Sequence, residues 1–324
     1  MAKVLGMGNA LVDIVALISS DELLTQLNIS KGSMQLVEKH VSNGLTRQIR
    51  DSIQKTTSGG SAANTIYGLA HLNIETAFLG KIGKDEWGEL FLQDLKDSSI
   101  KPLLIESINE SGRAIALISP DSERTFATFL GAAVELSAED IMPEHFDGYE
   151  IFHVEGYLVQ NHELLEKSLK LAKENKMIVS LDLSSYNIVT ENLDFLHDII
   201  FKYVDIVFAN EDEARAFTGK EPEEALDAIS KLCDIAVVKI GKNGSLIKRG
   251  DEKHRVGIIA ANSIDTTGAG DLYASGFIYG IIKNKSLDKC GYLGSILSGK
   301  IIEVLGAKYH QDKWGELRKL VEAV

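Results

Sequence analysis

The chain has 324 residues and a formal net charge of −13, with 44% hydrophobic and 25% charged residues. This composition predicts one large core with a smaller appendage, and it excludes a disordered chain. The negative charge repels the phosphate backbone and anionic membrane surfaces, so neither nucleic acid nor a membrane is an expected partner. An anionic ligand would need local devices such as backbone amides, helix N-termini, a metal ion or a few cationic side chains.

Cysteines, histidines and apolar runs give no sign of metal, redox or membrane function. Cys233 and Cys290 lie far apart, so we expect two reduced thiols in a cytoplasmic protein. The eight histidines lack a ligand spacing, and no structural metal is predicted. Asn9 and Asp13 interrupt the first apolar run, which argues against a signal peptide. No stretch approaches the ~18 apolar residues that a membrane span requires.

Short apolar runs alternate with segments of helical spacing along the chain. The predicted strands are Lys3 to Gly8, Thr76 to Leu79, Ile151 to Val154, Ile178 to Leu181, Ile206 to Ala209 and Ile235 to Ile240. The predicted helices are Ser61 to Leu72, Glu86 to Ser98, His162 to Asn175, Glu211 to Thr218, Glu223 to Leu232, Ala269 to Lys283 and Ser286 to Val304. This alternation predicts an α/β fold whose mostly parallel sheet is covered by helices on both faces.

Two regions, about 13–35 and about 111–130, break that alternation. They contain strand-like runs without a crossover helix between them, so antiparallel pairing is expected. Together they could form a small sheet that covers the mouth of the main domain as a lid. The chain has four prolines and no flexible linker, so residues 1–324 are predicted to form a single domain with this lid.

The segment Asp265-Thr266-Thr267-Gly268-Ala269-Gly270-Asp271 gives the strongest functional signal. Its glycines permit a tight turn, and the apolar spacing that follows predicts a helix start. Free amides and the positive end of the helix dipole would then point at one spot, which suits a phosphoryl group in transfer. A plain strand-to-helix turn, with Asp271 as an N-terminal carboxylate, is the structural alternative.

A second glycine-rich segment, Ser58-Gly59-Gly60-Ser61-Ala62-Ala63-Asn64, precedes an amphipathic run. Adjacent glycines let a polyhydroxylated ligand pack against the backbone, and Asn64 offers both a donor and an acceptor. A helix N-cap turn explains the same residues about as well.

These two segments, in this order, resemble the signature motifs of the ribokinase family, the PfkB carbohydrate kinases. The similarity runs over essentially the whole chain, and the stretch from Ser111 to Ala133 looks most like the adenosine kinase-like branch. The resemblance implies a ribokinase-like three-layer core with a small β-sheet lid. It also implies ATP-dependent phosphorylation of a primary hydroxyl, with the 5′-hydroxyl of adenosine as first choice and ribose or another sugar as the alternative.

The resemblance implies a role for each residue that would act on the phosphoryl group. Asp271 matches the general base that takes the proton of the attacking hydroxyl, while Gly268, Ala269 and Gly270 match the anion hole. Arg124 matches a lid arginine that approaches the transferring phosphate, although a lone arginine is more often a solvated surface residue. A guanidinium suits that role because it stays charged and binds two oxygens at once.

Five further positions match the family's substrate contacts, namely Asn9, Asp13, Gly59, Gly60 and Asn64. Asp13 matches a carboxylate that accepts hydrogen bonds from ring hydroxyls. An ionised carboxylate can bridge two neighbouring hydroxyls because all its lone pairs are acceptors.

The ATP side is implied by two further motifs. Asn210 and Glu213 resemble an Asn-x-x-Glu element near Mg²⁺, with Glu213 reaching the metal through water, although a helix cap explains both. Gly241 and Gly244 resemble a nucleotide-side loop, and a hairpin turn fits them equally well. Lys239 stands where the family often has threonine, which puts a side-chain contact to ATP there in doubt.

Asp265 could help to hold a monovalent cation such as K⁺, as it does in some relatives. A monomer and a lid-mediated homodimer both remain open.

Two other functional classes compete with the kinase hypothesis. A nicotinamide-dependent dehydrogenase is suggested by Gly6-Met7-Gly8, but Leu11 replaces the third glycine of the motif. The second is a catalytically silent regulator that binds a sugar or nucleotide on the same fold.

Overall fold

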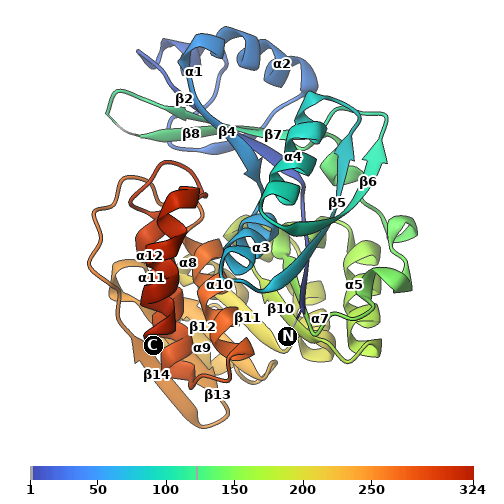
Figure 1. Ribbon diagram of the computed structural model, residues 1–324, viewed down its shortest axis with the longest axis vertical. Coiled ribbons are helices and arrows are strands. Elements are labelled where there is room, and N and C mark those ends of the chain that lie inside the picture. The colour runs from blue at the N-terminus through green and yellow to red at the C-terminus, as the bar shows by residue number, and fades with distance from the viewer. Residues whose placement is uncertain (1–2, 122) are drawn as a thin grey trace.

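The computed structural model describes residues 3–121 and 123–324, and it contains two sheets of unequal size (Figure 1). The nine-stranded sheet has the order β14-β13-β12-β11-β10-β9-β1-β5-β6. Its strands are β1 (Lys3–Met7), β5 (Glu75–Gly83), β6 (Ile100–Ser107), β9 (Ile151–Glu155), β10 (Ile178–Asp182), β11 (Ile206–Asn210), β12 (Ile235–Lys239), β13 (Ser245–Arg249) and β14 (Glu252–Val256). All neighbours pair in parallel except the β12–β13 and β13–β14 pairs, which are antiparallel. The predicted mostly parallel α/β sheet is therefore confirmed.

Helices cover both faces of the large sheet. One face packs against α3 (Ser61–His71), α4 (Glu86–Asp97), α10 (Ala269–Ile282), α11 (Leu287–Ile301) and α12 (Trp314–Glu322). The other face packs against α5 (His162–Glu174), α6 (Tyr186–Glu191), α7 (Leu193–Tyr203), α8 (Glu211–Thr218) and α9 (Pro222–Ile229). The three-layer core expected from the resemblance is confirmed.

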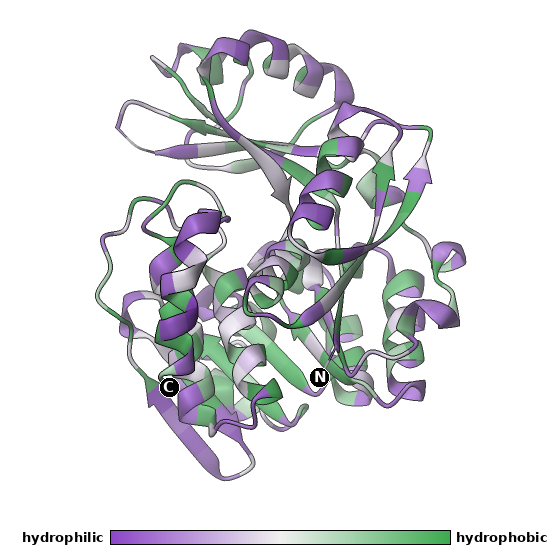
Figure 2. Cartoon of the chain, in the orientation of Figure 1, coloured by the Kyte–Doolittle hydropathy of each residue, from purple (hydrophilic) through white to green (hydrophobic). Residues whose placement is uncertain are grey.

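Strand periodicity explains why both faces are apolar. Val207 and Phe208 are adjacent in β11, yet they belong to the two different hydrophobic clusters because successive side chains point to opposite faces. Figure 2 shows the hydrophobic colour concentrated in these central strands, while the edge strand β14 is mostly hydrophilic. Each fully buried Phe or Leu of this kind contributes about 1.5–3 kcal/mol relative to an exposed one.

The small sheet has the order β3-β8-β7-β2-β4 and forms the lid. Its strands are β2 (Leu11–Leu17), β3 (Met34–Leu36), β4 (Ile53–Gly59), β7 (Gly112–Ile118) and β8 (Arg124–Phe129). β4 lies outside the two segments from which this sheet was expected. Antiparallel pairing was wrong for β2 and β7, which pair in parallel. Because β2 follows β1 and β7 follows β6, both leave parallel strands of the large sheet in the same direction.

The two faces of the lid have different surroundings. Val12 and Ile14 point away from the large sheet and pack with α1 (Glu22–Gln26) and α2 (Lys39–Gln48) in the hydrophobic core. Asp13 and Val15, which alternate with them, line the cleft on the other side. Within the described ranges, no helix is long and apolar enough to cross a membrane.

Candidate active site

Polar side chains gather where the parallel strands of the large sheet end. Glu155, Asp182 and Asn210 are the last residues of β9, β10 and β11, and Lys239 ends β12. Asn9 follows β1 by two residues. Ligands of open α/β sheets bind at the carboxyl ends of the strands, so this edge is the expected place for a site.

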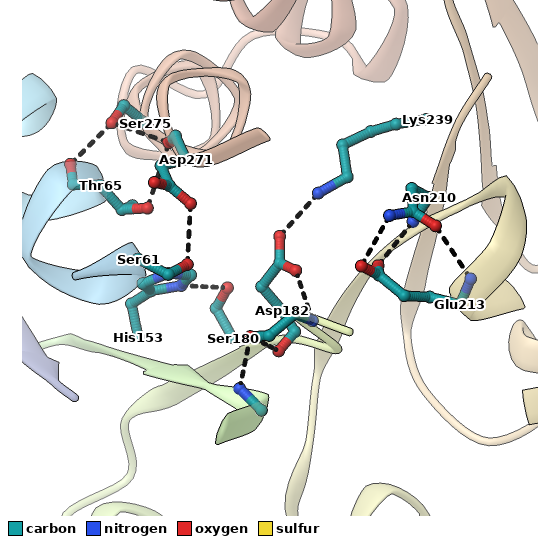
Figure 3. A network of polar contacts seen from close by, with 12 residues as sticks. Ser61, Thr65, His153, Ser180, Asp182, Asn210, Glu213, Lys239, Asp271 and Ser275 are labelled. Carbon is teal, nitrogen blue, oxygen red and sulfur yellow. Dashed lines mark hydrogen bonds and ion pairs between the residues drawn. The ribbon is translucent and has the colours of Figure 1, made fainter. Parts of the chain in front are cut away.

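Asp271 lies in the first turn of α10, beside the start of α3. Its Oδ1 accepts a hydrogen bond from Ser61 Oγ at 2.7 Å (Figure 3). Its Oδ2 accepts one from Asn64 Nδ2 at 2.9 Å. Thr65 Oγ1 donates to the Asp271 carbonyl at 3.1 Å. The two glycine-rich segments, separated by more than two hundred residues, therefore meet through these side chains.

The turn before α3 depends on its two glycines. Gly60 has φ +96°, a conformation that residues with a Cβ rarely adopt, and a Cβ there would lie 2.2 Å from the Asn9 carbonyl oxygen. A Cβ on Gly59 would lie 2.1 Å from the Asp13 carboxyl carbon. The structure thus brings together all five predicted substrate-binding residues, because Asn64 lies in the first turn of the helix that follows Gly60.

The electrostatics of this cluster raise the pKa of two carboxyl groups. Burial raises the pKa of Asp271 to about 6, against hydrogen bonds from Asn64 and Ser61. Burial also raises the pKa of Asp13 to about 7, and Asp271 adds to that shift while Lys308 opposes it. Values in this range suit a group that must exchange a proton near neutral pH.

Asn64 carries an acceptor without a donor. Its side chain is buried and its Nδ2 is committed to Asp271, while Oδ1 finds no hydrogen-bond partner among the residues the structure describes. A buried acceptor of this kind costs about 1–3 kcal/mol unless a donor reaches it. A ligand hydroxyl fits this requirement.

Glu155 organises the turn before α3 but was not predicted from the sequence. Its Oε1 accepts from the backbone N and the Nδ2 of Asn9, and its Oε2 accepts from the Ala62 amide, each at 2.9 Å. Burial raises its pKa to about 7, opposed by these hydrogen bonds. Its position directly after a predicted strand was the only available signal.

Lys308 is a second residue that sequence reasoning missed. Its buried ammonium donates to Ser58 Oγ and to Asp94 Oδ2, and it lies 4.9 Å from the centre of the Tyr67 ring. Burial lowers the pKa of Lys308, while Asp94 and Asp13 raise it. Lys308 thereby supports strand β4, which leads into the turn before α3.

Arg124 reaches from the lid to the glycine-rich loop. Its guanidinium pairs with Asp265 and donates to Thr267 Oγ1 at 2.9 Å and to the Ile264 carbonyl at 3.3 Å. Asp265 also accepts from the amides of Thr267 and Gly306. Protein donors thus engage both carboxylate oxygens of the residue predicted to help hold a monovalent cation.

A cleft lies between the lid and this loop. Its lining includes the side chains of Asp13, Lys55, Thr57, Arg124, Asp265 and Thr267. Both the carboxylate predicted to bind ring hydroxyls and the predicted lid arginine therefore face the same space.

Asn210 and Glu213 form a capping box at the start of α8. Asn210 Oδ1 accepts from the Glu213 amide at 2.9 Å, and Glu213 accepts from the Asn210 backbone N and Nδ2 at 2.8 and 2.7 Å. Burial raises the pKa of Glu213 to about 7, and Asp182 adds to the shift. The helix-cap alternative is confirmed by these hydrogen bonds. A role of Asn210 and Glu213 near Mg²⁺ stays a prediction.

The loop predicted to lie on the ATP side is the turn of the β12–β13 hairpin. The Ile240 amide donates to the Gly244 carbonyl at 2.8 Å, and Gly241 and Gly244 have φ +53° and +93°. The hairpin alternative is therefore confirmed, while contact of this turn with ATP stays a prediction. Lys239 precedes the turn, and its Nζ lies 2.7 Å from Asp182 Oδ2.

The described residues offer no ready-made metal cage. Among them, no group of three or more His, Cys, Asp or Glu side chains is arranged to hold a metal ion. Mg²⁺ keeps several waters and uses few protein carboxylates, so Glu213 fits an outer position that is reached through water.

Comparisons with known proteins agree with this architecture. Residues 29–314 match the family described as pfkB family carbohydrate kinase. The crystal structure of a probable sugar kinase from Rhizobium etli is 32% identical with a TM-score of 0.90, covering 100% of this chain and 99% of that one. Adenosine kinase from Sinorhizobium meliloti is 31% identical with a TM-score of 0.88, covering 98% and 99%. Adenosine kinase of Saccharomyces cerevisiae is 26% identical, covering 96% and 98%.

The fold, the lid and the family match define an ATP-dependent kinase that acts on a sugar or a nucleoside. The chain belongs to the pfkB family of carbohydrate kinases. The dehydrogenase alternative is wrong, because β1 leads into strand β2 and not into the helix that a dinucleotide-binding turn requires.

Proposed function

We propose that this kinase transfers the γ-phosphoryl group of ATP to the 5′-hydroxyl of adenosine, with Asp271 as general base. The proposal rests on the hydrogen bonds that Asp271 accepts from Asn64 and Ser61. Asp271 lies at the start of α10, and the glycine-rich loop before this helix can bind a phosphate. Asn64 has a spare buried acceptor beside it, which is suited to a ligand hydroxyl.

The chemistry follows from where the proton and the charge go. The substrate hydroxyl oxygen forms a bond to the γ-phosphorus, the bond from that phosphorus to the bridging oxygen breaks, and ADP leaves with the electron pair. Asp271 takes the hydroxyl proton. Amides of Gly268, Ala269 and Gly270, with the guanidinium of Arg124, would balance the charge on the transferring group.

Asp13 would hold the ring hydroxyls of the acceptor in the cleft between the lid and the glycine-rich loop, next to the turn that contains Asn9, Gly59 and Gly60. Lining this cleft on the lid side are the apolar side chains of Val15, Ala114, Ala116 and Phe126. Such a wall offers a free sugar no hydrogen bonds, whereas a flat nucleobase can pack against it. This observation favours a nucleoside over a sugar, and the likeness to adenosine kinases over nearly the whole chain points the same way.

ATP would lie on the other side of Asp271, near the β12–β13 turn with Gly241 and Gly244. Mg²⁺ supplies charge neutralisation to the phosphates when it is bound, and Asn210 and Glu213 would hold its waters. Asp265 would hold the loop in shape through Thr267 and Gly306, with K⁺ as an optional partner.

A sugar kinase is the second candidate, because the Rhizobium etli protein, named as a probable sugar kinase, is similar over the full length. A panel of nucleosides and free sugars, each with Mg²⁺ and ATP, distinguishes the two by the phosphate ester formed. We expect adenosine to give the highest kcat/KM. Activity on a free sugar with none on nucleosides would overturn the adenosine assignment.

A further inference from the structure

Lys239 is a buried cation at the centre of the site that the proposed function leaves unused. It ends β12, pairs with Asn210 of β11 in the sheet register, and keeps only 16% of its side chain exposed. Its ammonium donates to Asp182 Oδ2 at 2.7 Å (Figure 3). The carboxylates of Glu213 and Asp271 raise its pKa together with Asp182, although burial opposes them, so the group stays charged.

The ammonium also lies against the glycine-rich loop. A Cβ built on Gly270 would be 3.1 Å from Lys239 Nζ, which places the charge beside the backbone of the predicted anion hole. Gly270 is in the first turn of α10, where unpaired amides and the helix dipole attract anions. The Lys239 ammonium, at the end of β12, and these amides, at the start of α10, therefore lie beside the same region.

Lys239 has donor capacity to spare. An ammonium carries three N–H groups, and within residues 3–121 and 123–324 its one hydrogen bond is the bond to Asp182. Buried charges are costly unless they are paired, and the pair with Asp182 meets this need while two donors stay available. A phosphate oxygen is the kind of acceptor that would satisfy them.

We infer that Lys239 is a phosphate-binding catalytic residue, which donates to the β- or γ-phosphate oxygens of ATP while Asp182 holds its ammonium beside Gly270. The inference rests on the proposed phosphoryl transfer and adds a residue to it. As the bond between the γ-phosphorus and the bridging oxygen breaks, negative charge grows on the β-phosphate of ADP. Lys239 would offset that charge, and Asp271 would still take the hydroxyl proton.

A purely structural role for Lys239 makes a different prediction. If the lysine only neutralises Asp182, removing both charges together should restore a normal site. If the lysine binds phosphate, the double variant should fold well yet stay impaired toward ATP. The pair Lys239→Met and Lys239→Met with Asp182→Asn therefore separates the two roles.

The matched control is Lys248→Met. Lys248 lies on the neighbouring strand β13, pairs with Asp227 at 2.6 Å and keeps 20% of its side chain exposed, so it loses a similar ion pair outside the site. For each variant, isothermal titration would give the Kd of the β,γ-imido analogue of ATP and, separately, that of the acceptor. Steady-state kinetics would give kcat and the KM for ATP.

We expect the double variant to lose about 10- to 100-fold in kcat/KM for ATP and to bind the ATP analogue more weakly, with the acceptor Kd unchanged. Lys248→Met should match the wild type. Recovery of normal ATP binding and turnover in the double variant would overturn the inference, as would equal weakening of acceptor and nucleotide. The double variant leaves neither a lone Lys239 ammonium nor a lone Asp182 carboxylate, so it keeps the test valid even where Lys239→Met alone fails to fold.

The wild-type protein separates this inference from the proposed function. If it phosphorylates adenosine and the double variant does so equally well, the inference fails and the proposed function stands. If it phosphorylates no member of the substrate panel, yet binds the ATP analogue in a Lys239-dependent way, the proposed function fails and the phosphate contact stands.

Discussion

The two halves of the active-site edge differ in how their polar groups are satisfied. On the proposed acceptor side, Asn64 Oδ1 is buried without a donor among the residues that the structure describes, and Asp13 lines the cleft. On the nucleotide side, Asn210 and Glu213 bond to each other, and Lys239 pairs with Asp182. The first half leaves a buried acceptor oxygen for a ligand to satisfy, whereas the second pairs its carboxylates within the protein and keeps spare donors on Lys239.

This difference indicates how each half would respond to mutation. Acceptor-side residues keep hydrogen-bonding capacity for a ligand, so changing them should alter turnover or acceptor binding more than stability. Nucleotide-side residues also hold helix α8 and the ends of β10 and β12, so changing them should alter both. The predictions below test this contrast, beginning with the residue that lies between the halves.

Asp271→Asn should give the largest loss. Asn has nearly the shape of Asp but cannot accept the hydroxyl proton, so kcat should fall by on the order of 10²- to 10⁴-fold while acceptor binding is retained. Steady-state kinetics and isothermal titration measure the two quantities. Asp198→Asn, on the exposed surface of α7, is the control. Near-normal kcat in Asp271→Asn would remove this residue from the role of base and weaken the contrast at its centre.

Arg124→Gln should give the next largest loss, roughly 10- to 100-fold in kcat. In the structure this arginine links the lid to Asp265, so two explanations of the loss compete. If Arg124 only fastens the lid, Asp265→Asn should cause the same loss, and the double variant should lose no more than either single one. If it meets the phosphate, Arg124→Gln should cost more than Asp265→Asn. Equal losses would assign it to lid closure alone.

The sequence predicted the six central strands of the large sheet because they are mostly buried and read as short apolar runs, such as Ile206 to Ala209. It gave no candidate for the edge strands β6 and β14, which are largely exposed or half-buried. It also missed β4, whose amino-acid sequence is largely polar. Lys55 and Thr57 of that strand line the cleft, so the face that would have signalled a buried strand serves the site instead. A functional surface removes the pattern from which a strand is recognised.

The same limit applies to the site. Asp271 and Asn64 could be brought together because each lies in a glycine-rich motif with a recognisable family order. Glu155 and Lys308 are single polar residues whose partners lie more than ninety residues away along the chain, and no local spacing marks them. Their hydrogen bonds form only in the folded protein, where segments distant in sequence lie side by side. Lys239 was read as a departure from the family, and its neighbour Asp182 was not singled out.

Activity should fall as pH decreases through the range of the raised carboxyl pKa values. Asp13 and Asp271 have pKa values of about 7 and about 6, and both must be ionised to hold a hydroxyl and take its proton. A carboxyl is protonated below its pKa, so kcat/KM for the acceptor should be full above these values. Between them it should drop roughly tenfold per pH unit, and more steeply below.

The variant Asp13→Asn should lower kcat/KM at every pH and remove the upper inflection. The pH dependence that remains should then come from Asp271. A kcat/KM profile that stays flat well below both pKa values would show that the ionisation of neither carboxyl controls the reaction. The raised pKa values would then have no role in catalysis on the acceptor half.

Glu213→Gln should give the smallest effect, and it tests the nucleotide half directly. The amide has one acceptor oxygen where the carboxylate has two, so one of the two Asn210 donors loses its partner. Loss of a capping contact costs about 1 kcal/mol, which thermal unfolding measures as a lower Tm. If Glu213 also holds the waters of Mg²⁺, the Mg²⁺ concentration for half-maximal activity should rise a few-fold at saturating ATP, roughly 1 kcal/mol or less in binding.

A second capping box in the chain provides the control for this variant. Ser137 donates from its backbone N and Oγ to Asp140 Oδ2, at 2.9 and 3.1 Å, in a short helical turn next to α5. Asp140→Asn should lower Tm without changing the Mg²⁺ requirement, because this box lies outside the set of strand ends. If Glu213→Gln behaves in the same way, Glu213 is a helix cap alone. The nucleotide half would then bind its ligand through the loop amides and Lys239, without help from this carboxylate.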